Sequence, residues 1–118
     1  MIRLGSAGKM GKGVFATELI TPNQLIMSCH SLEIDKDDVD HVLETRIHHH
    51  WFEHPWKKTG GLFVLGLISM LNHSKKPNVR IEFDKTSHGY IANCIALATI
   101  APRTQLFMDY GPGTLSFD

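Results

Sequence analysis

The chain has 118 residues and a formal net charge of zero, with 42% hydrophobic and 20% charged residues. This length predicts one domain that buries roughly two thirds of its unfolded surface. The balanced charge provides no long-range field toward nucleic acid or an anionic membrane, so we expect neither as a partner. No apolar run reaches about 18 residues, so no membrane-spanning helix is expected, and the N-terminus lacks the apolar segment of a secretion signal.

Two cysteines, Cys29 and Cys94, are too few for a disulfide framework, and both fall in strand-like segments. We therefore expect reduced, buried thiols. The expected location is intracellular, either the cytoplasm or, in a eukaryotic host, the nucleus.

Glycines recur near the N-terminus, at positions 5, 8, 11 and 13. They predict a loop over residues 5–13 whose backbone can approach a ligand closely. A phosphate-binding loop does not fit, because Lys12 is followed by glycine and not by Ser or Thr. A hairpin without a ligand is the simpler alternative. Strands are predicted from Val14 onward and over residues 24–30, on either side of a turn at residues 21–23.

Acidic residues dominate positions 33–44, where Lys36 is the single basic residue. Val39, Leu43 and Ile47 recur at four-residue spacing, which predicts a short amphipathic helix with Asp35 as its cap. A solvated helix face explains the acids. The functional alternative is attraction of a basic peptide tail.

Eight histidines are many for this length, and several gather in residues 48–54. His50 and His54 are four positions apart and would share one helix face as metal ligands if the segment were helical. No carboxylate or cysteine stands at a spacing that would complete such a site, so we expect no metal. Residues 55–61 are predicted to form a loop.

A largely apolar run, residues 62–71, is long enough for a buried strand and one helical turn. Asn72, His73 and Ser74 follow at its end. Buried polar groups must be satisfied, so these residues should bond to other backbone or to a ligand. Pro77 then fixes the direction of the chain. An ordinary turn is the simpler interpretation.

The C-terminal third alternates as short strands. Residues 79–84 predict a half-exposed strand, 85–89 a turn and 90–98 its hairpin partner. A last short strand is expected from Leu106, and it finishes in the turn Asp109-Tyr110-Gly111. The fold class is therefore mostly β with little helix.

Three blocks of the sequence resemble the SET-domain protein lysine methyltransferases. They are residues 66–78, which contain Asn-His-Ser-x-x-Pro-Asn, the turn Asp109-Tyr110-Gly111, and the glycine block 10–16. The resemblance implies that residues 1–118 form one minimal SET domain, similar to viral and bacterial members. It implies several small sheets, a C-terminal segment threaded beneath a loop, and a variable insert over residues 33–59.

The activity that the resemblance implies is methyl transfer from S-adenosylmethionine to a lysine side chain of a protein, with a histone-like tail as one candidate substrate. A homodimer is left open. The implied catalytic residue is Tyr110, whose hydroxyl would orient the amine. The cofactor would contact Met10, Gly11, Lys12, Asn72 and His73, largely through the backbone. The substrate channel would be lined by His50, Phe52, Tyr110 and Phe117.

The chain departs from the family pattern in two ways. The usual Tyr-x-Phe reads His50-Trp51-Phe52 here, and no cysteines for a zinc cluster follow Tyr110. Two other functions therefore remain open. One is a catalytically silent SET-like binding module, and the other is a histidine-rich metal-binding or structural domain.

Overall fold

The structure is a computed structural model that describes residues 1–44 and 50–109. The strands are β1 (Ile2–Ser6), β2 (Lys12–Ala16), β3 (Leu25–Ile34), β4 (Trp51–Glu53), β5 (Gly61–Val64), β6 (Asn72–His73), β7 (Val79–Thr86), β8 (Gly89–Ala96) and β9 (Phe107–Met108). The helix α1 covers Val39–Leu43, and short 3₁₀ helices cover Gly8–Met10, Lys36–Asp38 and Leu67–Met70. Within the described ranges, no helix has the length and apolar content to cross a bilayer.

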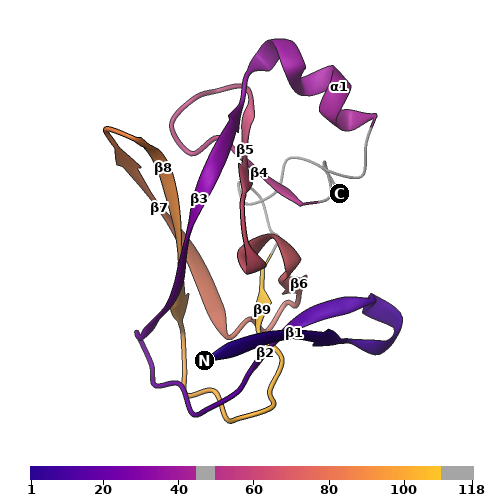
Figure 1. Ribbon diagram of the computed structural model, residues 1–118, viewed down its shortest axis with the longest axis vertical. Coiled ribbons are helices and arrows are strands. Elements are labelled where there is room, and N and C mark those ends of the chain that lie inside the picture. Colours follow the sequence, from indigo (N-terminus) through magenta and orange to yellow (C-terminus); the bar gives the residue numbers. More distant parts are fainter. Residues whose placement is uncertain (45–49, 110–118) are drawn as a thin grey trace.

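The strands form three small sheets (Figure 1). Five strands make the largest, in the order β4-β5-β3-β8-β7, with every neighbouring pair antiparallel. The hairpin β1–β2 is a second sheet, and β6 and β9 form a third, parallel pair. The predictions of a mostly β chain and several small sheets are confirmed.

The hydrophobic core lies on one face of the large sheet. Alternate residues of β8 point into it, so that Tyr90, Ala92, Cys94 and Ala96 are buried. Burial raises the pKa of the Cys94 thiol to about 12, which keeps it protonated at neutral pH. Cys29 is only half-buried, and neither cysteine is in a disulfide.

The large sheet curls until its two outer strands meet. Phe52 of β4 and Phe83 of β7 belong to opposite edges in the strand order, yet their ring centroids are 5.5 Å apart. The rings meet edge to face, a favourable aromatic arrangement. The curl therefore brings residues of both edge strands to one place on the surface.

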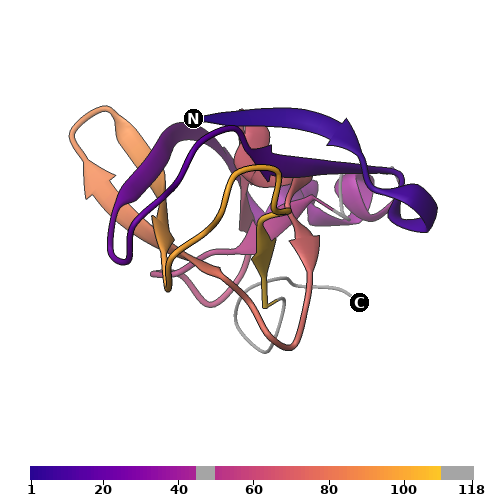
Figure 2. The same cartoon turned by 90° about the horizontal axis from the view of Figure 1, so that it is seen from below.

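The N-terminal segment differs from the loop that the glycines predicted. β1 pairs with β2 from Ile2↔Ala16 to Ser6↔Lys12, so most of residues 5–13 belongs to a hairpin. Figure 2 shows this hairpin extending along one side of the molecule. Strand β1 escaped prediction because glycine is depleted in strands and weakens the alternation. The turn at its tip requires glycine for its backbone conformation, because Gly8 and Gly11 have φ of 62° and 83°.

The predicted helix is shorter than its spacing indicated, and Asp35 does not cap it with its side chain. Asp35 has extended backbone and no side-chain capping bond. Its carbonyl accepts a bond from Asp38 N at 2.9 Å, which begins a 3₁₀ turn before α1. Ile47, His48 and His49 lie outside the described residues. Because residues 51–53 are a strand, His50 and His54 do not share a helix face.

His54 is buried in a polar network that closes the loop after β4. Its Nε2 lies 2.8 Å from a Glu33 carboxylate oxygen, and its Nδ1 accepts bonds from the backbone N–H groups of Trp56 and Lys57. Two donors at Nδ1 leave the ring proton on Nε2, which donates to Glu33. Lys57 Nζ lies 2.6 Å from the same oxygen. In the described part of the chain, no three His, Cys, Asp or Glu side chains converge for a metal ion.

We predict that Glu33→Gln destabilises the fold at pH 7 and that this penalty shrinks below about pH 4.5. The Lys57 hydrogen bond and then the His54 bond hold the pKa of Glu33 below its ordinary 4.5. A depressed pKa contributes stability that is present above the unfolded pKa and lost as the pH falls through the folded value. Urea unfolding of both proteins between about pH 7 and 3 measures the penalty.

Glu18→Gln is the matched control, since Glu18 is exposed and has no ion pair within residues 1–44 and 50–109. It should change stability little at any pH. A Glu33→Gln penalty that stays constant with pH would contradict the role of the charged carboxylate.

Candidate functional site

The structure joins the Asn-His-Ser motif to the segment that leads to Asp109, as the parallel pair β6–β9. Asn72 lies opposite Phe107, and His73 opposite Met108. Ser74 N donates to Met108 O at 3.0 Å, which extends the pairing beyond β6. The buried run that precedes Asn72 forms β5 and a 3₁₀ turn, as predicted. The polar residues at its end are therefore satisfied largely by the C-terminal segment.

Asn78 holds the same C-terminal segment from the other side. Its side-chain amide donates to Gln105 O at 2.9 Å, and its side-chain oxygen accepts from Phe107 N at 2.7 Å. Asn78 N also donates to Phe107 O at 3.1 Å. The loop of residues 72–78 thus wraps around residues 105–108, which is the threading that the resemblance implied.

Asn72 joins this threaded region to the N-terminal hairpin. Its amide nitrogen donates to Lys12 O and to Gln105 Oε1, both at 2.9 Å, so both amide protons are used. Gly13 lies beside this contact, and a Cβ there would stand 2.5 Å from Gln105 Oε1. Glycine at position 13 therefore leaves room for the glutamine that Asn72 binds.

At the tip of the hairpin, the Gly11 backbone groups are hydrogen-bonded within the turn, and the space beside Gly11 is open. Gly11 N donates to Gly8 O at 3.0 Å and Gly11 O accepts from Ala7 N at 2.7 Å, inside the turn. A Cβ on Gly11 would meet nothing within 4 Å. Met10 is 52% exposed, and Lys12 is exposed as well. A ligand at this tip would thus find side chains and free volume beside the Asn72 contact.

His73 and Asp109 form the charged end of the site. His73 Nδ1 lies 3.7 Å from Asp109 Oδ1, and Lys75 Nζ lies 3.9 Å from the same oxygen. All three side chains are partly or largely exposed. At these distances the contacts are electrostatic rather than tight hydrogen bonds. They place a carboxylate next to the β6–β9 pair.

The predicted channel residues are only partly brought together. His50 Nδ1 donates to Ser69 O at 2.8 Å, which fixes its ring against the 3₁₀ turn before β6. Phe52 is buried behind Phe83. Tyr110 and Phe117 lie outside the described residues.

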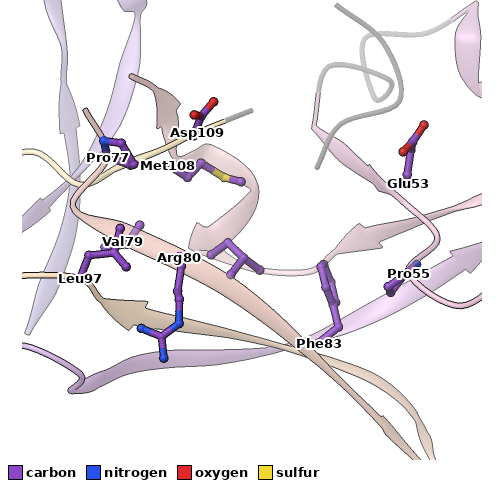
Figure 3. A pocket seen from close by; sticks show the side chains of 10 residues that line it. Glu53, Pro55, Pro77, Val79, Arg80, Phe83, Leu97, Met108 and Asp109 are labelled. Atoms are coloured by element: carbon purple, nitrogen blue, oxygen red, sulfur yellow. The ribbon is translucent and has the colours of Figure 1, made fainter. Parts of the chain in front are cut away.

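A pocket of about 280 Å³ opens between the outer strands β4 and β7, next to β9 (Figure 3). Its lining comprises Glu53, Pro55, Pro77, Val79, Arg80, Ile81, Phe83, Leu97, Met108 and Asp109. Most of these side chains are apolar. Arg80 is engaged with Glu82, whose carboxylate lies 2.6 Å from Arg80 Nε. Asp109 connects the pocket to His73 and thereby to the site around Asn72.

Sequence reasoning missed two residues of this region, Gln105 and Glu53. Gln105 precedes a strand of only two residues, too short for an alternation pattern to indicate its partner. Glu53 is the exposed residue at the end of the short strand β4. β4 has only three residues, which is too few for an alternation pattern to indicate where Glu53 points.

The comparisons with known proteins identify the fold family. A sequence model of the SET domain matches residues 11–111. The chain belongs to the SET-domain family. The match overlaps all three blocks of the resemblance, and Asn72 of one block is hydrogen-bonded to Lys12 of another. No curated protein sequence matches the chain.

Solved structures share this SET-domain fold. A protein from Plasmodium falciparum with a provisional histone methyltransferase assignment is 25% identical, with a TM-score of 0.77 over 93% of this chain and 92% of that one. A humanized mutant of Chaetomium thermophilum Polycomb Repressive Complex 2 bound to GSK126 is 21% identical, with a TM-score of 0.78 over 97% of this chain. The ctPRC2 complex bound to S-adenosylmethionine is also 21% identical, with a TM-score of 0.76 over 96%. The SET domain described here spans only 15% of either Polycomb chain.

We predict that Asn72→Ala lowers the free energy of unfolding of this SET domain by about 1–3 kcal/mol, because Lys12 O and Gln105 Oε1 lose their shared donor. Asn93→Ala is the matched control. Asn93 also makes two side-chain bonds, to Ser28 and Asp84, but on the outer face of the large sheet.

Asn93→Ala should lower the free energy of unfolding by less, at most about 1 kcal/mol, because water can replace the exposed hydrogen bonds of Asn93. Urea unfolding measures both variants. A double-mutant cycle of Asn72→Ala with Gln105→Ala should show a coupling of about 0.5–1.5 kcal/mol. Equal costs for the two asparagines, together with no coupling, would contradict the structural role of Asn72.

Proposed function

We propose that this SET domain transfers a methyl group from S-adenosylmethionine to the amine of a lysine side chain in a protein or peptide. The observation that carries the proposal is the pair of hydrogen bonds that the Asn72 amide donates to Lys12 O and to Gln105 Oε1. It unites the glycine turn, the Asn-His-Ser motif and the segment that leads to Asp109. The first two belong to blocks of the family resemblance, and the third leads directly to the Asp109-Tyr110-Gly111 block.

The residues around this union fit the cofactor. Met10, Gly11 and Lys12 border the open space at the hairpin tip, and Asn72, which His73 follows in β6, donates a hydrogen bond to Lys12 O. When bound, S-adenosylmethionine supplies an electrophilic methyl group on a positively charged sulfur. The Asp109 carboxylate beside His73 offers opposite charge at this end of the site. The solved ctPRC2 complex bound to S-adenosylmethionine has the same fold, which supports the proposal.

The pocket between β4 and β7 suits the approach of a lysine. A lysine amine has a pKa of about 10.4 in water and must lose its proton before it attacks. The apolar side chains of Ile81, Phe83 and Met108 line the pocket and would disfavour the charged amine there. Asp109 stands where this pocket adjoins β6–β9. Tyr110 follows it directly in sequence and is proposed to orient the amine through its hydroxyl.

A catalytically silent binding module is the second candidate. It is favoured by His50, which stands in place of a channel tyrosine and whose ring is bonded to Ser69 O. Such a module would keep the fold and the cofactor site without turnover.

Calorimetry with S-adenosylmethionine and a transfer assay with its radiolabelled methyl group test the two candidates. The proposal predicts binding and labelling of lysine-containing peptides, with no label when the lysine is replaced by arginine. Binding without labelling across a broad peptide array would favour the silent module. Absence of cofactor binding by the folded protein would overturn both.

We predict that Tyr110→Phe lowers turnover by about 10- to 1,000-fold while cofactor affinity changes little, because one orienting hydroxyl near the transition state is lost. Tyr90→Phe is the matched control. Tyr90 is buried in β8 and stacks on Trp56, 5.4 Å between ring centroids, away from the β6–β9 pair. It should retain turnover within about twofold. Equal turnover in wild type and Tyr110→Phe would remove Tyr110 from the chemistry.

A further inference from the structure

The pocket between β4 and β7 has two ends with different neighbours. At one end, Met108 and Asp109 adjoin β6 and the proposed cofactor site. At the other end, Glu53 and Pro55 come from β4 and the residues that follow it, and Phe83 lies close to them (Figure 3). If a lysine of a substrate peptide occupies the cofactor end, the Glu53 end remains open to another side chain of the same peptide.

No described residue neutralises the charge at the Glu53 end of the pocket. Glu53 is exposed, and among residues 1–44 and 50–109 its carboxylate has no hydrogen bond or ion pair. The nearest candidate cation in the lining, Arg80, is engaged with Glu82 at 2.6 Å. Figure 3 shows the Arg80 guanidinium on the opposite side of the pocket from the Glu53 and Asp109 carboxylates. The pocket therefore combines apolar walls with a negative rim.

We propose that Glu53 determines substrate specificity by pairing with an arginine that lies within two residues of the acceptor lysine. An arginine fits both features of this end. Its aliphatic stem would cover Pro55 and Phe83, and its guanidinium would pair with the carboxylate through two parallel bonds. Arginine is more weakly hydrated than lysine, which favours it at a half-apolar site. This inference rests on the proposed function, because it assigns the neighbour of a lysine acceptor.

The edge position of β4 supports an extended peptide as the occupant. β4 is an outer strand of the large sheet, and its exposed residue Glu53 lines the pocket. An extended segment lying there would place alternate side chains on the same face. The acceptor lysine and a basic neighbour would then enter the two ends of one pocket.

The experiment compares peptides that carry one lysine and either arginine or citrulline at each position from two before to two after it. Citrulline keeps the shape of arginine and removes its charge. Fluorescence anisotropy measures the affinity of each peptide, and the radiolabel assay measures its kcat/KM. At one or more positions, the arginine peptide should bind the wild type about fivefold more tightly than the citrulline peptide, as expected for a partly exposed ion pair. Added salt should reduce this ratio.

Variants of Glu53 identify the pairing group. Glu53→Gln should bring the arginine-to-citrulline ratio close to one, and Glu53→Lys should reverse it. Glu18→Gln, which changes an exposed acid outside the pocket, should keep the wild-type ratio. No arginine preference in the wild type, or a preference that survives in Glu53→Gln, would overturn the assignment.

The two readouts separate this inference from the proposed function. A Glu53-dependent preference in binding without any methyl transfer would sustain the specificity role and contradict the enzymatic activity. Methyl transfer to lysine with no dependence on Glu53 would support the enzymatic activity and contradict the specificity role.

Discussion

The parallel pair β6–β9 is the constraint on which the rest of the structure depends. It joins two segments that are far apart in the sequence, so its formation must overcome a large loop-closure entropy. Two residues per strand cannot offset that cost alone. The side chains of Asn72 and Asn78 supply further bonds to Gln105 and Phe107, and the loop between them encloses the C-terminal segment. Asn72 and Asn78 of the motif therefore have a structural role, because their side chains hold the C-terminal segment in place.

The hairpin β1–β2 depends on the same constraint. Leu106 N donates to Val14 O at 2.8 Å, and Ala16 N donates to Thr104 O at 2.9 Å, so the segment leading to β9 runs beside β2. Asn72 then fixes Lys12 from the other side. A ligand held between the hairpin tip and β6 would contact three segments that are already bonded to one another. Such preorganisation lowers the entropic cost of binding.

A second polar network organises the opposite end of the molecule. His54, Glu33 and Lys57 close the loop between β4 and β5, which keeps the short edge strand β4 in place. Phe52 can then pack on Phe83 across the curled sheet. The pocket lies between these two fixed ends. Its shape follows from the curl, and its charge from Glu53 and Asp109.

The sequence predicted the elements with strong periodicity and missed those set by long-range contacts. The β7–β8 hairpin was expected over residues 79–98 and forms over 79–96, because alternation there is clear and the turn is local. The run before Asn72 was also predicted correctly. The β6–β9 pair has too few residues for any period, and it became predictable only through the resemblance. Gln105 and the Phe52–Phe83 contact depend on threading and curl, which local patterns do not encode.

Amide hydrogen exchange with and without S-adenosylmethionine tests most directly whether the hairpin tip and the β6–β9 pair form one binding unit. The account predicts that the cofactor slows exchange together in residues 8–13, 72–74 and 105–109, while β8 at residues 89–96 changes little. Slowed exchange confined to one of these three segments, or centred on the outer sheet, would contradict it.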